Sequence, residues 1–180
     1  MILVPGKFLF LATPRTASRS IKEMVRKNCK DTKETLEHHV HPDDIFRKFP
    51  EARDVPIFTV VREPYDHALS WFYHAVVRNA PQRENTRDFL TFLRTMFISW
   101  YFSDRLNVYA EVATHFLPYQ AGVVSAYETM TGHAFEGQAP VIGLRPRTKP
   151  VSKMLTSFTE RAVRQRFPQD IELWQTLLTE

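Results

Sequence analysis

The chain has 180 residues, of which 43% are hydrophobic and 24% charged, a composition that fits one globular domain with a real core and excludes a disordered chain. The 24 Lys and Arg residues exceed the 20 Asp and Glu residues, and the net charge of +4 suits an anionic ligand without selecting one. Cys29 is the only cysteine, which excludes an intrachain disulfide. Since no apolar segment is long enough to span a bilayer or to serve as a signal peptide, we expect a soluble, cytoplasmic protein.

A strand–turn–helix unit is predicted near the amino terminus. The apolar run Phe8–Leu11 is typical of a buried strand, and Pro14 ends it because proline has no N–H to donate to a ladder. Ile21, Met24 and Val25 then follow helical spacing. Such a turn points backbone N–H groups and the positive end of a helix dipole at one place, which predicts an anion site.

The side chains of this turn fit the same interpretation. Hydroxyl groups and permanent positive charges are what a phosphate group would attract, and the candidate binding residues are Arg15, Thr16, Ala17, Ser18, Arg19 and Ser20. An alternative is that the serines only cap the helix. The turn has no glycine and no Lys-Ser/Thr pair, which disfavours an ordinary ATP- or GTP-binding P-loop.

A second strand–turn–helix unit is predicted around residue 62. Ile57–Val61 is a short, continuous, β-branched run, and Pro64 suits the first position of a helix. Arg62 therefore lies at the carboxyl end of a strand, where open α/β sheets bind their ligands. His67, Ser70 and His74 share another helix face and are predicted to line one cleft.

The rest of the chain alternates predicted elements and loops. Pro42, Asp43 and Asp44 are a typical helix opening, and 141–153 is a basic, proline-containing loop. We expect a third strand at 122–127 and helices at 87–102, 106–117 and 158–179, the last broken near Pro168. His38, His39 and His41 do not have the spacing of a zinc site, so no metal is predicted.

Taken together, the motifs resemble those of sulfotransferases that use 3′-phosphoadenosine 5′-phosphosulfate (PAPS), particularly the compact branch related to carbohydrate sulfotransferases. The run from Pro14 to Ser20 is similar to that family's 5′-phosphosulfate loop, P-[KR]-T-[GA]-[GS]-T-S. The run from Val60 to Ser70 is similar to its 3′-phosphate motif, V-R-[DN]-P-Y-x-R-x-x-S, with the same Arg-to-Ser spacing. Two shorter runs, 124–128 and 166–173, are similar to its L-R-Y-E strand and its C-terminal Y-x-x-D-[FI]-x-L helix.

The resemblance implies a fold and a nucleotide site. The expected fold is a three-layer α/β/α domain over residues 1–180, with a central, mainly parallel sheet like that of the P-loop nucleotide hydrolases. Residues 15–20 would bind the 5′-phosphosulfate, and Arg62 with Ser70 would bind the 3′-phosphate. Three positions depart from the family motifs: Ala17 stands in place of glycine, Arg19 in place of a hydroxyl residue and His67 in place of arginine.

The resemblance also implies an activity. A sulfuryl group would move from PAPS to a hydroxyl or amine of an acceptor by in-line displacement, releasing 3′,5′-ADP and requiring no metal. Arg15 would stabilise the charge that develops on the leaving group. A histidine would take the acceptor's proton, with His41 and His39 as the first candidates and His74 as a third.

The expected partner is a small-molecule or carbohydrate acceptor, with no specific nucleic acid and no membrane span. Two rival functions are kept. One is a nucleotide kinase or NTPase-like protein, which would prefer ATP with magnesium. The other is a catalytically lapsed basic module that binds a polyanion or nucleic acid in a salt-dependent way.

Overall fold

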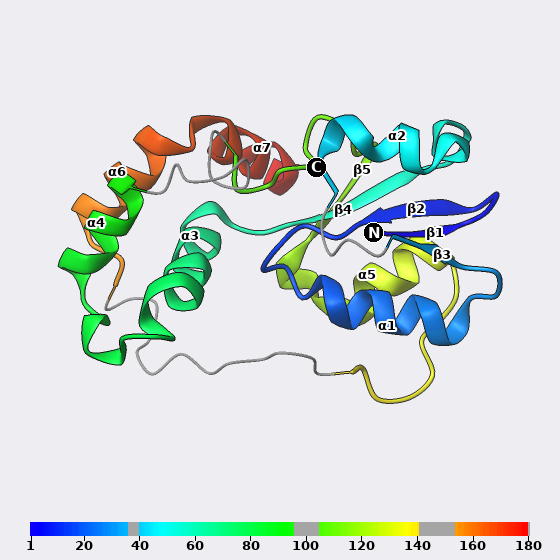
Figure 1. Ribbon diagram of the computed structural model, residues 1–180, viewed down its shortest axis with the longest axis horizontal. Coiled ribbons are helices and arrows are strands. Elements are labelled where there is room, and N and C mark those ends of the chain that lie inside the picture. Colours follow the sequence, from blue (N-terminus) through cyan, green and yellow to red (C-terminus); the bar gives the residue numbers. More distant parts are fainter. Residues whose placement is uncertain (36–39, 96–104, 141–153, 180) are drawn as a thin grey trace. The chain divides into compact units, whose positions relative to one another are not determined.

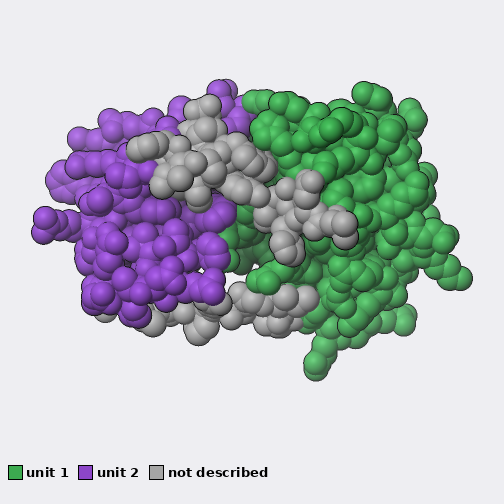
Figure 2. All heavy atoms as spheres, in the orientation of Figure 1, with its two compact units in different colours: residues 1–61, 108–144 green, residues 62–107, 145–180 purple. Residues whose placement is uncertain are grey.

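The computed structural model describes residues 1–35, 40–95, 105–140 and 154–179 and has an α/β architecture with a five-stranded mixed sheet (Figure 1). The chain forms two compact units, coloured separately in Figure 2. The sheet unit contains residues 1–61 and 108–144, and the helical unit contains residues 62–107 and 145–180. The expectation of a single domain over 1–180 stays a prediction.

The sheet has the strand order β3-β1-β2-β4-β5, made by β1 (Ile2–Val4), β2 (Phe8–Leu11), β3 (Lys33–Glu34), β4 (Ile57–Val61) and β5 (His115–Pro118). β2 and β4 pair in parallel and β4 and β5 pair in parallel, whereas β1 is antiparallel to both β2 and β3. The expectation of a mainly parallel sheet is therefore corrected to a mixed one. The reason is the tight turn between β1 and β2, in which Gly6 takes a φ of 68° and folds the chain back on itself.

The third predicted strand is wrong. The stretch expected to be a strand at 122–127 begins helix α5 (Gly122–Thr131). The third parallel strand, β5, overlaps the end of the stretch 106–117 that was expected to be a helix. Ala126, Tyr127 and Met130 follow helical spacing and are buried in the core of the sheet unit. Tertiary burial of this face overrides the strand propensity of Val123 and Val124.

The core of the sheet unit lies between the sheet and the helices α1 (Ser18–Asn28) and α5, which run along the same face in Figure 1. Phe8 and Phe10 enter this core from β2, and Ile21, Met24 and Val25 enter it from α1. Because side chains alternate along a strand, Leu9 and Leu11 point to the opposite face, where they are also fully buried. The prediction that β2 is buried on both faces is confirmed.

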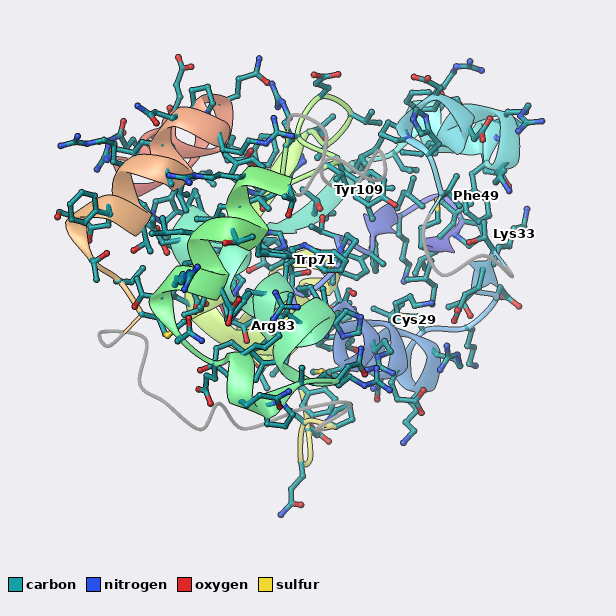
Figure 3. All side chains as sticks on the ribbon, turned by 60° about the vertical axis from the view of Figure 1, so that its left-hand side comes forward. Cys29, Lys33, Phe49, Trp71, Arg83 and Tyr109 are labelled. Carbon is teal, nitrogen blue, oxygen red and sulfur yellow. The ribbon has the colours of Figure 1, made fainter. Side chains whose placement is uncertain are left out.

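Figure 3 shows two further residues of this unit. Cys29 follows α1 and packs half-buried against the core, where burial raises the pKa of its thiol. Tyr109 is fully buried, and its hydroxyl donates to the carbonyl oxygen of Val40 at 2.8 Å. This bond fixes the turns before β5 to the segment that leads into α2 (Ile45–Lys48). The predicted helix opening at Pro42 is confirmed as a short 3₁₀ turn, Pro42–Asp44.

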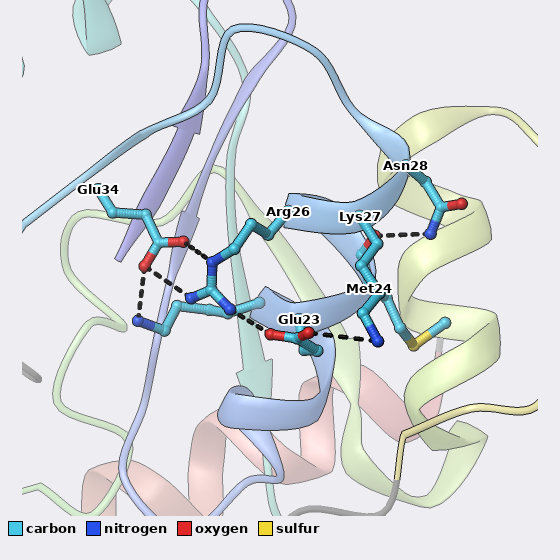
Figure 4. Close-up of polar contacts among 7 residues, drawn as sticks. Glu23, Met24, Arg26, Lys27, Asn28 and Glu34 are labelled. Carbon is cyan, nitrogen blue, oxygen red and sulfur yellow. Dashed lines mark hydrogen bonds and ion pairs between the residues drawn. The ribbon is translucent and has the colours of Figure 1, made fainter.

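The outer face of α1 is tied to strand β3 by a network of charges (Figure 4). Glu34 accepts hydrogen bonds from Lys22 at 3.2 Å and from Arg26 Nε at 2.9 Å, and Arg26 also pairs with Glu23. Burial alone would raise the pKa of Glu34, but the hydrogen bonds from Arg26 and Lys22 outweigh it and hold that pKa below its usual value. The network therefore stabilises the position of α1 only while Glu34 is ionised.

We expect Glu34→Gln to lower the free energy of unfolding by about 1 kcal/mol at neutral pH, because a network of ion pairs is lost. A carboxylate whose pKa is lowered by folding contributes stability above its unfolded pKa, and this contribution disappears as the pH falls through the folded pKa. Urea unfolding should show a larger difference in stability between the variant and the native protein at pH 7 than at pH 3. Glu51→Gln is the control, since Glu51 pairs with Lys33 at the surface. An equal loss of stability in Glu34→Gln at both pH values would contradict the prediction.

The helical unit is built from α3 (Pro64–Phe72), α4 (Thr86–Thr95), α6 (Ser157–Arg166) and α7 (Pro168–Thr179). The predicted helix after β4 is confirmed and passes into a π-helical turn at Tyr73–Val77. The predicted C-terminal helix, broken near Pro168, is confirmed as α6 and α7. Phe72, Phe89 and Phe167 form the centre of this core. None of the helices in the described ranges is long and apolar enough to cross a membrane.

Candidate functional site

The turn between β2 and α1 is braced by threonine hydroxyl groups. The hydroxyl of Thr13 hydrogen-bonds that of Thr59 on β4 at 2.7 Å, and the hydroxyl of Thr16 donates to the carbonyl oxygen of Thr13 at 2.7 Å. All three threonines are buried. The side chain of Thr16 therefore holds the turn together, and what it can offer to a ligand is its backbone amide.

The backbone of this turn alternates in handedness. Arg15 has a φ of 65° and Ala17 a φ of 57°, whereas Thr16 between them is not in the positive-φ region. Alternation of this kind curves successive amide groups into a concave nest, which is a recognised anion-binding arrangement. The arrangement is unusual because neither left-handed position is a glycine, and a side chain costs about 1–2 kcal/mol there.

The N-terminus of α1, which follows directly, has no side-chain cap. Its N-cap residue is Ala17, no side chain caps it by a hydrogen bond, and its first turn contains no acidic residue. The N-cap position is therefore not occupied by a serine; Ser18 and Ser20 lie within the first turn and are at least 94% buried. Arg19 is exposed beside the same end of the helix. The positive charge of Arg19 thus adds to that of the helix dipole, and both would stabilise an anion bound at this end of the helix.

Because Ala17 occupies a left-handed position, Ala17→Gly is expected to raise the free energy of unfolding by about 0.5–1 kcal/mol. In a chain of this size the melting temperature should rise by about 1–4 °C. Differential scanning calorimetry checks this. Ala162→Gly in the middle of α6 is the matched control and should lower stability by about 1 kcal/mol, since glycine is unfavourable in a helix interior. A loss of stability in both variants would contradict the prediction.

The second predicted binding segment starts where β4 ends. Arg62 is 7% exposed, and its Nε donates to Asp66 Oδ2 at 2.5 Å, one turn along α3. The carboxylate of Glu63 caps α3 by accepting from the amides of Tyr65 and Asp66, at 3.1 and 2.7 Å. Burial raises the pKa of Glu63, and these hydrogen bonds partly offset the shift. The sequence motif is thus a capped helix start that holds an arginine with a fixed side-chain direction.

The three residues predicted to share a face of this segment differ in exposure. His67 is fully buried and Ser70 is 5% exposed, whereas His74 is half-buried in the π-helical turn beside Trp71. The position at which the family motif has an arginine is therefore occupied by a histidine inside the helical core. Ser70 stays the candidate that accompanies Arg62.

The histidines proposed as general bases are only partly described. His41 caps the 3₁₀ turn at Pro42, its Nδ1 accepting from the amide of Asp43 at 3.4 Å and lying 3.3 Å from an oxygen of the Asp43 carboxylate. While Nδ1 accepts that hydrogen bond, the neutral ring carries its proton on Nε2. Nε2 can therefore accept a proton from a substrate only after the ring changes to the tautomer protonated on Nδ1. His39 and the basic loop at 141–153 lie outside the described residues. No group of three His, Cys, Asp or Glu side chains within the described ranges is placed to hold a metal.

Sequence reasoning missed three residues that support these segments. Thr59 braces the turn between β2 and α1, and Asn107 and Asp170 hold the backbone at Arg62. Asp170 lies in the short C-terminal motif, which was the only signal that could have found it. A groove between α4 and α6, with an apolar floor and Arg94, Arg161 and Arg166 around it, contains none of the predicted site residues.

The predicted site residues are therefore found in two segments, one in each compact unit. The turn at 13–20 belongs to the sheet unit, and the segment from Arg62 to Ser70 belongs to the helical unit. Each segment follows the carboxyl end of a parallel strand, as the sequence predicts. Comparison of the chain with protein-family models, with curated proteins and with solved structures gives no match to any of them.

Proposed function

We propose that this chain is a PAPS-dependent sulfotransferase that transfers a sulfuryl group to a hydroxyl or amine of an acceptor, of which a carbohydrate is one class. The observation that carries the proposal is the N-terminus of α1, which is uncapped, has no acidic residue in its first turn, and is preceded by a turn of alternating handedness with Arg15 and Arg19 beside it. An oxyanion is the ligand that satisfies all of these features.

The choice of a phosphosulfate rests on what the turn lacks and on the second segment. The turn has no Lys-Ser/Thr pair of the kind that holds a nucleoside triphosphate with its magnesium ion. Arg62 and Ser70 supply a cation and a hydroxyl at the end of β4, which suits a second, separate phosphate group. PAPS and 3′,5′-ADP are distinguished from ADP and ATP by phosphate groups attached at two separate ribose positions, 5′ and 3′.

The roles of the residues follow from their chemistry. The amides of 16–19 and the guanidinium of Arg15 would stabilise the negative charge that builds up on the 5′-phosphate as its bond to sulfur breaks. Arg62 and Ser70 would bind the 3′-phosphate and orient the nucleotide. His41 or His39 would accept the proton that the acceptor loses as its oxygen or nitrogen bonds to sulfur. The fold would be the expected three-layer α/β/α domain of the P-loop type.

Calorimetric titration with 3′,5′-ADP in the absence of metal tests the proposal, with ATP plus magnesium as the comparison. Tight binding of 3′,5′-ADP and no binding of ATP is the expected result. Preference for ATP with magnesium would instead identify a kinase or NTPase-like protein, and failure to bind either nucleotide would end the enzymatic proposal.

A second candidate function is a basic module that binds a polyanion without catalysis. It is favoured by the burial of His67. The family motif has an arginine at this position, and a buried histidine does not present a comparable positive charge to a nucleotide. Affinity for heparin or RNA that falls steeply with salt, combined with indifference to 3′,5′-ADP, would support this function.

A further inference from the structure

The C-terminal motif contains a carboxylate that is nearly excluded from solvent. Asp170 lies in the first turn of α7 and is 1% exposed. Its Oδ1 accepts from the amides of Leu106 and Asn107 at 3.1 and 2.8 Å, and from the side-chain Nδ2 of Asn107 at 2.8 Å. Burial raises the pKa of Asp170, and the hydrogen bonds from Asn107 and Leu106 partly offset that cost. Asp170 thus fixes both the backbone and the side chain of Asn107.

The orientation of the Asn107 amide follows from its two partners. An ionised carboxylate only accepts and a backbone N–H only donates. With Nδ2 directed at Asp170, Oδ1 is directed away from it and accepts from the backbone amide of Arg62 at 3.2 Å. No other assignment of the amide nitrogen and oxygen satisfies both contacts. Asp170, Asn107 and Arg62 therefore form a hydrogen-bonded chain, called the relay below, that runs from α7 to the residue following β4.

The relay restrains the backbone at the first residue beyond the sheet. The pairing of β4 with β5 ends at Val61, so the hydrogen bonds of the sheet fix the backbone only up to that residue. The Asn107 bond continues the restraint to the amide of Arg62, and the contact between Arg62 Nε and Asp66 restrains the other end of the same residue. Backbone and guanidinium are thus both held by hydrogen bonds, which preorganises the direction of the arginine before a ligand binds.

From this geometry we infer that Asn107 and Asp170 are positioning residues for the 3′-phosphate, acting through the backbone of Arg62. The inference rests on the proposed function, because it takes Arg62 to be the ligand of that phosphate. It assigns to the aspartate of the C-terminal motif a role in nucleotide recognition in addition to its role in holding α7. A purely structural role would lower stability and leave the recognition of the 3′-phosphate unchanged.

The ratio of the dissociation constants of 5′-AMP and 3′,5′-ADP isolates the contribution of the 3′-phosphate, because the two nucleotides differ only in that group. Calorimetry on the native chain should give a large ratio. Asn107→Ala should reduce it about tenfold, the effect of losing one well-oriented hydrogen bond. Asp170→Ala should reduce it similarly, whereas Asp170→Asn keeps an oxygen acceptor for Asn107 and should restore most of the ratio.

Asn85→Ala is the matched control. Asn85 also lies in the helical unit and bonds an aspartate in both directions, donating to Asp88 Oδ2 at 2.7 Å and accepting from the amide of Asp88 at 2.9 Å. Its removal should lower stability by about 1 kcal/mol and leave the ratio unchanged. In an Arg62→Ala background, Asn107→Ala should change the ratio no further, since the relay then has nothing to position.

The outcomes separate the two proposals. If the native chain binds 3′,5′-ADP no better than 5′-AMP, the assignment of Arg62 fails and the positioning role fails with it. If the native ratio is large and a folded Asn107→Ala variant keeps it, the proposed function stands and the positioning role is overturned. Protection of the Arg62 amide against hydrogen exchange, expected in the native chain and lost in Asn107→Ala, tests the relay without any nucleotide.

Discussion

Replacing Arg62 with alanine is expected to weaken the binding of 3′,5′-ADP by about 10- to 150-fold, the range for losing a charged hydrogen bond of about 1.5–3 kcal/mol. Affinity for 5′-AMP should change little, because that nucleotide lacks the phosphate that Arg62 is proposed to bind. Calorimetry on both nucleotides measures the effect. The buried position of Arg62 and its pairing with Asp66 make a thermal unfolding curve a necessary companion measurement.

Two further variants complete this test. Arg62→Lys keeps the charge and loses the planar fork, so its affinity should fall between those of the native chain and Arg62→Ala. Arg78→Ala removes an exposed arginine from the same unit and serves as the control for net charge. A folded Arg62→Ala variant that still binds 3′,5′-ADP as tightly as the native chain would sink the assignment.

The second large effect is expected at Arg15. Arg15→Gln should lower kcat for sulfuryl transfer by about 10²–10³-fold, because it removes one donor directed at charge that develops on the leaving phosphate. KM for PAPS should change less than kcat, since the interaction is strongest in the transition state. Release of 3′,5′-ADP, followed in the presence of an acceptor, is the measurement.

Arg15→Lys should recover much of that loss, because a cation returns to the same position. Arg53→Gln is the matched control, an exposed arginine of the sheet unit that lies over the ring of Phe46. Equal losses in Arg15→Gln and Arg53→Gln would mean that the effect comes from net charge, and the role of Arg15 would then be abandoned.

The parts of the fold that the sequence predicts are those with a strong local pattern. Phe8–Leu11 and Ile57–Val61 are apolar runs ended by proline or a charged residue, and both are strands. Pro64 was predicted to begin a helix and does so, and Pro168, predicted to break the C-terminal helix, lies where α6 ends and α7 begins. The stretch around β5 was predicted to be a helix and the start of α5 to be a strand. Over so few residues, the spacing of the apolar side chains fits both the helical and the strand period.

The residues of the candidate site also divide into those that local sequence patterns predict and those that they do not. The turn at 13–20 and the segment that begins at Arg62 are found from local motifs, because the residues that form each segment are close together in the sequence. Asn107 and Asp170 are 63 residues apart in the sequence and join only in the folded chain. The left-handed conformation of Ala17 could not be predicted either, since alanine has no preference for it and the surrounding contacts impose it.

The parallel pairing of β4 with β5 has a consequence for how the protein folds. The segment 62–107 leaves the sheet after β4 and returns just before β5, so that pairing closes a very long loop in the unfolded chain. The entropy lost in that closure is smaller once the inserted segment has collapsed around its own aromatic side chains, among them Phe72, Phe89 and Phe92. The hairpin of β1 and β2 has no such requirement. Assembly of the sheet should therefore begin at the hairpin, with the β5 edge added last, and its rate should depend on mutations in the helical unit.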